Sequence, residues 1–341
     1  MKNLSFLNKI IFLINNIFAL LFVASFVLPY VSPRSFPLLS ILSLTVPLLI
    51  FIHIIFIVYW WIVGVKKQFF LSVFCILLAI AFSYFPYKFS GKDVISGDSF
   101  TVMNFNVRLF NRYHWIDDKN IPTKISDFID QNEPDILAIQ EFYPSKDLNI
   151  NLPYKYIEYK GDKKDFGQVI YSKYKIINKG TLDFDNSSNN AIYIDIIKSS
   201  DTIRIYNLHL ESLGVKEKNI ELDGLSESGS KKIIHRLETA FIKQQKQVEQ
   251  FLEHKNNCNY KIIICGDFNN TAYSWAYHHV KGNMKDTFFE AGKGFGKTYS
   301  FLKYPLRIDF ILADEKFKIN HHQSFDKDLS DHEPILARLS F

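Results

Sequence analysis

The stretch from Ile262 to Thr271 joins a short apolar run to two polar side chains that could act on one reacting group. Four apolar residues, 262–265, predict a buried strand, and Gly266 lets the backbone turn where that strand ends. Asp267 and Asn269 then emerge together, two residues apart. A carboxylate and a carboxamide at this spacing can face the same atom, but a strand followed by an Asx-type turn has the same pattern. This stretch alone leaves both interpretations open.

Four other segments of the chain also place polar side chains beside the end of an expected strand. These side chains are Asn106, Glu141, His209, and Asp309 with Asp331 and His332. Asp309 lies among apolar residues, so its carboxylate needs a partner, and His332 is a candidate. No single segment is specific, because Asp-His pairs and Asp-x-Asn turns are common. Their occurrence at five strand ends favours convergence on one site.

The elements that must position these residues are short strands separated by turns and two amphipathic helices. The apolar patterns predict strands at 100–107, 136–141, 154–159, 167–172, 176–182, 190–197, 202–210, 261–265, 306–312 and 335–341. Helices are expected at 123–132 and 231–254, with a short one at 273–280. Residues 211–230 are charged and weakly patterned, which favours an insertion or loop. Strands and helices alternate only in part, so we expect an α+β fold of two packed sheets with flanking helices.

The order of these motifs resembles that of the endonuclease/exonuclease/phosphatase superfamily, the fold of DNase I. The motifs are Asn104-Phe105-Asn106-Val107, Ile139-Gln140-Glu141, Asn207-Leu208-His209, Gly266-Asp267-Phe268-Asn269, Arg307-Ile308-Asp309-Phe310-Ile311 and Ser330-Asp331-His332-Glu333-Pro334-Ile335. The resemblance implies a DNase I-like, four-layer two-sheet β-sandwich flanked by helices over residues 100–341. It does not extend to the first part of the chain.

The resemblance also implies a Mg²⁺ or Mn²⁺ ion. Glu141 resembles its principal ligand, and Asn106 and Asp331 resemble further ligands or supports, since hard divalent cations take carboxylate and amide oxygens. Whether one metal ion or two operates stays open.

The remaining motif residues resemble the catalytic groups of that superfamily. Asp309 and His332 would form a carboxylate–imidazole pair that serves as an acid/base group or holds the scissile phosphate. Asp267 resembles the residue that orients and deprotonates the attacking water, and Asn269 one that hydrogen-bonds the phosphate. His209 resembles a phosphate-contacting histidine. Which group is the formal base stays open. Five further residues could contact substrate, although surface or packing roles are the simpler interpretation: Arg108, Tyr143, Lys173, Tyr299 and Arg307.

The first 92 residues contain no Asp or Glu, and they include three apolar runs at about 10–31, 36–65 and 69–87. Each run is near or above the roughly 20 residues that cross a bilayer's hydrocarbon core. We therefore expect a membrane domain of three transmembrane helices at 1–92, a linker at 93–99 and the catalytic domain at 100–341. The distribution of Lys and Arg among the loops slightly favours a cytoplasmic N-terminus. That orientation would place the catalytic domain outside the cytoplasm.

These observations predict a membrane-anchored, magnesium-dependent phosphodiesterase or nuclease that hydrolyses a P–O bond with activated water. The net charge of +5 is mild and does not identify nucleic acid as the partner. Nucleic acid is the first choice of substrate and a phospholipid, as for sphingomyelinases, the second. Two alternatives remain open: a phosphatase, and a catalytically inactive membrane-tethered binding or scaffold protein.

Overall fold

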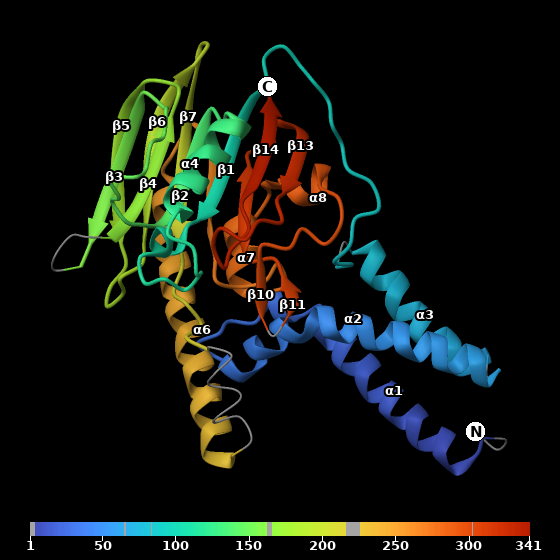
Figure 1. Cartoon of the computed structure of the whole chain (residues 1–341). Helices are drawn as coiled ribbons and strands as arrows, with labels where there is room; N and C mark the ends of the chain where they lie inside the picture. The colour runs from blue at the N-terminus through green and yellow to red at the C-terminus, as the bar shows by residue number, and fades with distance from the viewer. Residues whose placement is uncertain (1–3, 65, 83, 162–165, 216–225, 302) are drawn as a thin grey trace.

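The computed structural model describes residues 4–64, 66–82, 84–161, 166–215, 226–301 and 303–341. From Phe100 onward these residues form two six-stranded sheets that pack face to face (Figure 1). The first sheet has the order β13-β14-β1-β2-β4-β3 and the second the order β5-β6-β7-β8-β12-β9. A two-stranded hairpin, β10-β11, is separate from both sheets.

The strand bounds follow the alternating patterns in the sequence closely. They are β1 Phe100–Asn106, β2 Ile136–Phe142, β3 Tyr154–Lys160, β4 Phe166–Ser172, β5 Ile176–Asp183, β6 Asn190–Lys198, β7 Asp201–His209, β8 Lys261–Asp267, β9 Lys285–Asp286, β10 Tyr299–Phe301, β11 Tyr304–Leu306, β12 Asp309–Ala313, β13 Lys318–Ser324 and β14 Ile335–Ser340. The sequence patterns did not indicate β9, β10, β11 or β13. The strand expected from residue 306 begins only at Asp309.

The core between the sheets is built from every second residue of the facing strands. Val102 of β1, Ala138 of β2, Ile205 of β7, Ile263 of β8 and Ile311 of β12 all belong to this buried cluster. Side chains of a strand alternate between its two faces, so the neighbouring residues point outward, where helices cover them. This alternation matters for the site, because it fixes which polar residues at the strand ends face inward.

Helices cover the outer faces of both sheets and complete a four-layer α+β sandwich. Helix α4 (Ile121–Asn132) packs through Ile125 and Ile129 on the outer face of the first sheet. Helices α6 (Glu227–Asn256) and α7 (Trp275–Lys281) pack on the outer face of the second sheet. A short helix, α8 (Thr287–Ala291), lies beside β12 and β13. Helix α6 begins four residues before its expected start, and residues 216–225 of the expected insertion lie outside the described residues.

The N-terminal part of the chain forms helices that extend away from the sandwich (Figure 1). They are α1 (Phe6–Ser25), the 3₁₀ turn η1 (Leu28–Tyr30), α2 (Pro37–Val63) and α3 (Lys66–Ala81). Among the described residues, two helical stretches are long and apolar enough to cross a membrane, Phe6–Tyr30 and Pro37–Val63. The expectation of three such helices is corrected to two. The third, α3, has 16 residues and is about 24 Å long, which is short of a hydrocarbon core of about 30 Å.

The segment between α3 and β1 runs along the edge of the first sheet to the far end of the sandwich, where β1 starts (Figure 1). Lys88 pairs with Gly294, and the amide of Val94 donates to the carbonyl of Asn320 (3.0 Å). Arg338 binds the carboxylate of Asp93 (2.8 Å). The chain therefore makes hydrogen bonds with the sandwich before its first strand begins.

Candidate active site

At one end of the sandwich the inward-facing positions of both sheets change from apolar to polar. Continuing the alternation of the core places Asn106, His209, Asp267 and Asp309 in the space between the sheets. The register brings them to the same level, because Asp267 of β8 lies opposite both His209 of β7 and Asp309 of β12. The strand ends that the sequence singled out therefore converge on one point, as predicted.

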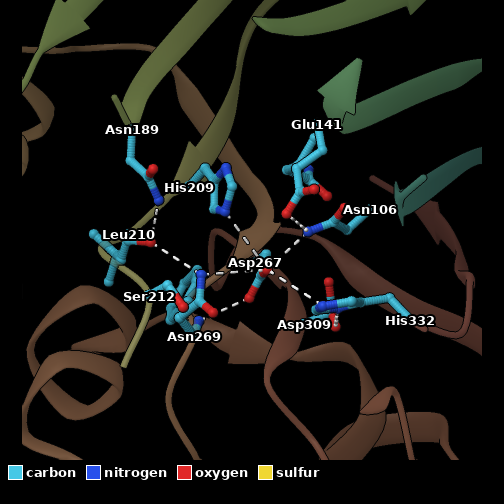
Figure 2. Close-up of polar contacts among 12 residues, drawn as sticks. Asn106, Glu141, Asn189, His209, Leu210, Ser212, Asp267, Asn269, Asp309 and His332 are labelled. Carbon is cyan, nitrogen blue, oxygen red and sulfur yellow. Dashed lines mark hydrogen bonds and ion pairs between the residues drawn. The ribbon is translucent and has the colours of Figure 1, made fainter. Parts of the chain in front are cut away.

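Asp267 lies at the centre of this cluster, as Figure 2 shows. Its Oδ2 accepts a hydrogen bond from Asn106 Nδ2 (3.0 Å) and lies 3.7 Å from the Nε2 atoms of both His209 and His332. Its Oδ1 accepts from the backbone amide of Asn269 (2.7 Å). Asn269 has a φ of 50°, which turns the chain back so that its own Nδ2 reaches the carbonyl of Leu210 (3.0 Å). The Asx-type turn is thus the local structure that places Asp267 and Asn269 in the cluster, so both interpretations of this stretch hold.

His332 and Asp309 form a buried carboxylate–imidazole pair. Nδ1 of His332 lies 2.9 Å from Oδ2 of Asp309, and both side chains are buried. Burial by itself would lower the pKa of His332, but the carboxylates of Asp309 and Asp267 outweigh it and raise that pKa to about 10. The ring of Tyr299 packs beside that of His332, with 5.0 Å between their centroids. His332 is therefore held as a cation at neutral pH, with Nε2 facing Asp267.

His209 has the opposite electrostatic state. Burial lowers its pKa, and the nearby Asp267 carboxylate does not compensate fully, while the charge of His332 lowers the pKa further. A neutral imidazole has one N–H donor and one acceptor nitrogen. Burial also raises the pKa of Asp267 to about 6, against the opposing effect of His332, which makes this carboxylate a stronger base than an exposed aspartate. The site thus holds a cationic imidazole, a neutral one and a basic carboxylate around one space.

Glu141 reaches the site through a distortion of strand β2. Simple alternation would point it outward, since its neighbour Gln140 faces the other sheet. The pairing of β2 with β4 shifts register between Ile139 and Phe142, and Glu141 has a φ of 50°. The resulting bulge turns its carboxylate towards Asn106, whose Nδ2 donates to Oε1 (3.2 Å). Burial raises the pKa of Glu141, against the opposing effect of His332.

Asp331 lies at the rim, where Arg108 binds it. Nε of Arg108 is 3.2 Å from Oδ2 of Asp331, and the backbone amide of Arg108 donates to Oδ1 of Asn106 (3.1 Å). Residues 108–111 all have positive φ values, 44–59°, which is a costly conformation for side-chain-bearing residues. This loop leads into a cavity of about 140 Å³ lined by Arg112, His114 and Lys119. Arg108, named above among the possible substrate contacts, forms an ion pair with Asp331 at this rim.

An amide network between the sheets supports the site, and the sequence analysis did not assign it a role. Gln140 Nε2 donates to the side-chain oxygens of both Asn104 (2.8 Å) and Asn207 (2.5 Å). Asn207 in turn donates to the carbonyl of Ile139 (2.9 Å), and Asn104 lies 3.5 Å from Asp309. These residues occupy the inward positions just before the polar side chains of the cluster. The alternation of each strand was the signal that could have identified them.

Two other candidate contacts lie outside the site. Arg307 is buried against Asp286 (2.7 Å) and packs among the rings of Phe288, Phe289 and Phe310. Lys173 pairs with Asp135 (3.0 Å). Both have structural partners, as the simpler interpretation held.

The donor set suits a hard divalent cation. Within the described part of the chain, the site has two positive groups, Arg108 and protonated His332. They face four carboxylates, those of Glu141, Asp267, Asp309 and Asp331. A cation would offset the remaining negative charge. Asp267, Asp309 and His332 also have ligand atoms within 4.8 Å of one another. In that group the imidazole is protonated and bound to Asp309, so the oxygen donors around Glu141 fit a metal ion better.

Two packed sheets with a cluster of polar groups at one end and helices outside define a DNase I-like fold. A family profile described as "Endonuclease/Exonuclease/phosphatase family" matches residues 103–332, more than half of the chain. The chain belongs to this family. A second profile, "Domain of unknown function (DUF8431)", matches residues 8–84. No curated protein matches the chain.

Solved structures share the fold at low sequence identity. The endonuclease/exonuclease/phosphatase from Bacteroides vulgatus is 19% identical, with a TM-score of 0.55, and the match covers 71% of this chain and 99% of that one. Humanized D. rerio TDP2 with 14 mutations is 16% identical (TM-score 0.55; 72% and 100% covered). The human Nocturnin catalytic domain with bound sulfate is 16% identical (TM-score 0.54; 75% and 97% covered). At this identity the likeness supports the fold alone.

Proposed function

We propose that this protein is a membrane-anchored, magnesium-dependent phosphodiesterase that hydrolyses a P–O bond by attack of water. The observation that carries the proposal is the buried Asp267 carboxylate, which lies 3.7 Å from the ring nitrogens of both His209 and His332. The three groups can act together on one phosphate, since a base, a neutral donor and a cationic acid surround one space.

In this proposal Glu141 is the principal ligand of Mg²⁺, and Asn106 and Asp331 are further ligands or supports. Bound there, the ion would polarise a phosphate oxygen and offset charge that develops on phosphorus. Asn106 lies between Glu141 and Asp267 as a hydrogen-bond donor to both. Its Oδ1 accepts from the backbone amide of Arg108 (3.1 Å), so a half-turn of the amide that presented oxygen to an ion would give up that hydrogen bond in exchange for the metal contact.

The chain's own residues carry the proton transfers. Asp267 orients a water molecule and removes its proton, and burial makes this carboxylate basic enough to do so near neutral pH. Asn269 is held beside it by the turn and donates to a phosphate oxygen. His332, protonated and oriented by Asp309, donates a proton to the leaving oxygen. His209, as a neutral imidazole, donates one N–H bond to the phosphate.

Nucleic acid is the substrate that we propose first. The cavity beside the site is lined by Arg112, His114 and Lys119 and by one acidic residue, Asp118, which Lys124 pairs with, so its basic surplus suits a polyanion that continues beyond the scissile phosphate. Tyr113 and Trp115, on the same loop, are exposed and could stack on bases. A phospholipid is the second candidate, because the apolar helices α1 and α2 would hold the site near lipid headgroups.

The apolar N-terminal helices support a membrane anchor. We propose that α1 and α2 cross the bilayer and that α3 lies with them, in a membrane domain at 1–92 joined by residues 93–99 to a catalytic domain at 100–341. The start of α1 and the end of α2 lie at the end of the bundle away from the sandwich (Figure 1). Basic residues at that end favour a cytoplasmic location for it, and an extracytoplasmic location for the catalytic domain.

A substrate panel tests this function. Full-length protein purified in detergent is assayed with single-stranded DNA, plasmid DNA, RNA, sphingomyelin and bis(p-nitrophenyl) phosphate, with Mg²⁺ and with a chelator. We expect Mg²⁺-dependent turnover that Asp267→Asn and His332→Gln each reduce by roughly 10²–10⁴. Asp326→Asn, which removes an exposed carboxylate paired with Lys297, is the matched control and should leave turnover unchanged. Turnover that survives Asp267→Asn would contradict the mechanism, and a panel without any turnover would favour the scaffold alternative.

A further inference from the structure

The turn that carries Asp267 and Asn269 continues directly into residues that contact the N-terminal helices. Oγ1 of Thr271 donates to the carbonyl of Ser43 in α2 (3.3 Å). The hydroxyl of Tyr273 donates to the carbonyl of Tyr84, just after α3 (2.8 Å). Both Thr271 and Tyr273 are buried. Two hydrogen bonds thus join the turn to the helices within four residues of Asn269.

Tyr273 belongs to the packed interior of the N-terminal helices rather than to the core of the sandwich. Its ring lies in the hydrophobic cluster that includes Phe22 of α1, Val46 of α2 and Cys75 of α3. The ring of Tyr84 packs against it with 5.1 Å between centroids. A side chain of the catalytic part therefore helps to close the end of the helical bundle.

Helix α6 supplies a second connection through two adjacent glutamines. Gln244 Nε2 donates to the carbonyls of Glu211 (2.7 Å) and Phe268 (3.2 Å), and its Oε1 accepts from Asn270 Nδ2 (2.7 Å). Phe268 and Asn270 flank Asn269 in the chain, and Glu211 follows Leu210, whose carbonyl accepts from Asn269. Gln244 is fully buried, so its bonds are shielded from water.

The next residue, Gln245, binds the N-terminal segment. Its Oε1 accepts from Oγ of Ser32 (2.9 Å) and from the backbone amide of Arg34 (2.9 Å), both in the connection between η1 and α2. Consecutive residues of a helix point in directions about 100° apart, so one turn of α6 can hold the site on one side and the N-terminal segment on the other. The void lined by both parts has room for only about 10 Å³, which shows close packing.

We infer that the N-terminal helical segment, residues 8–84, positions the catalytic turn 267–271 and is a working part of the active site as well as an anchor. The turn needs external support, because Asn269 has a left-handed backbone and its neighbours use buried hydroxyl and amide groups whose partners lie on α2, α6 and the residues after α3. Thr271 and Tyr273 are positioning residues, which act through Asp267 and Asn269. The part of this inference that concerns the rate of phosphodiester hydrolysis rests on the proposed function.

Paired variants of the full-length protein test the inference. Thr271→Val and Tyr273→Phe each remove one hydroxyl that binds the helices, and Thr271→Ser restores the first one. Tyr59→Phe is the matched control: it removes a hydroxyl that donates to Asn8 within the bundle and that, among the described residues, makes no hydrogen bond with the turn. We measure kcat and KM for bis(p-nitrophenyl) phosphate, melting temperature, and hydrogen exchange of the backbone amides of residues 266–274.

Thr271→Val and Tyr273→Phe should each lower kcat roughly threefold to tenfold, the range allowed by one lost hydrogen bond, with little change in KM. Amide exchange over 266–274 should accelerate by a similar factor. Thr271→Ser and Tyr59→Phe should resemble the unmodified protein in both measurements. Unchanged kcat and exchange in Thr271→Val and Tyr273→Phe would overturn the inference, as would equal effects in Tyr59→Phe. If the unmodified protein turns over no substrate, the proposed function fails, while the exchange measurement still decides whether the helices hold the turn.

Discussion

Replacing Asp309 by Asn tests whether a buried charge keeps His332 protonated. The change keeps the shape of the side chain but removes a negative charge whose oxygen lies 2.9 Å from Nδ1 of His332. At an effective dielectric constant of about 20, that charge stabilises the imidazolium by about 6 kcal/mol, or about 4 pKa units. Because the pKa of His332 is raised to about 10, its value in the variant should fall to the region of about 6.

The sign of the effect on activity follows from the role of His332 as an acid. In the unmodified protein the acid form persists as pH rises, until the pKa near 10 is reached. In Asp309→Asn it is lost from about neutral pH upward, so the alkaline limb of kcat/KM should move down by several pH units. At weakly alkaline pH, turnover should fall by roughly 10²–10⁴.

The assay is the initial rate of bis(p-nitrophenyl) phosphate hydrolysis by full-length protein, measured from weakly acid to strongly alkaline pH at constant free Mg²⁺. Asp326→Asn removes an exposed carboxylate from a surface ion pair and should leave the pH profile in place. Thermal unfolding of each variant shows whether it is folded. An alkaline limb that stays in place in a folded Asp309→Asn protein would refute the electrostatic reasoning, since another group would then set that limb.

Three further predictions concern the metal ion and stability. Glu141→Gln should weaken Mg²⁺ binding at least about tenfold in calorimetric titrations, and unchanged affinity would place the ion elsewhere. Asp286→Asn leaves the charge of buried Arg307 without its partner and should cost about 3–5 kcal/mol, seen as a lower melting temperature; a loss as small as that of Asp326→Asn would contradict this. Burial lowers the pKa of His322 to about 3, below its unfolded value of 6.5, so the unfolded state binds more protons in acid. Stability should therefore fall as pH drops below 6.5, by about 2 kcal/mol at about pH 5, and His322→Gln should flatten this dependence in chemical unfolding.

The arrangement of the site depends on distortions that residue patterns do not encode. Alternation along β7, β8 and β12 correctly places His209, Asp267 and Asp309 on the inward face, because regular strands have a period of two. Glu141 breaks that rule, and only the bulge against β4, with its left-handed backbone, brings the carboxylate to Asn106. Non-local pairing decides where such a bulge forms, so the local pattern marked Glu141 as a strand-end carboxylate but could not show that it faces inward.

The partners of the charged residues also depend on tertiary packing. Arg307 lies two residues before the motif residue Asp309 in the sequence, yet its neighbours in space are Asp286 and three aromatic rings. Arg108 follows the first motif and binds Asp331, more than two hundred positions later. A sequence records which charges are present, but an ion pair between distant segments exists only once the fold has brought them together.

The sequence by itself determined the order of the motifs, the inward-facing chemistry of the strand ends and the apolar nature of the first 92 residues, because each of these depends on residue type and local spacing. The tertiary structure alone decided that the N-terminal helices contact the catalytic turn through Ser43 and Tyr84, since those contacts join Thr271 and Tyr273 to residues about two hundred positions away. It also decided that α3 ends at Ala81, so that two helices rather than three are long enough to cross a membrane among the residues the structure describes. Local composition can predict an apolar segment, but its length as a helix and its partners depend on how the whole chain packs.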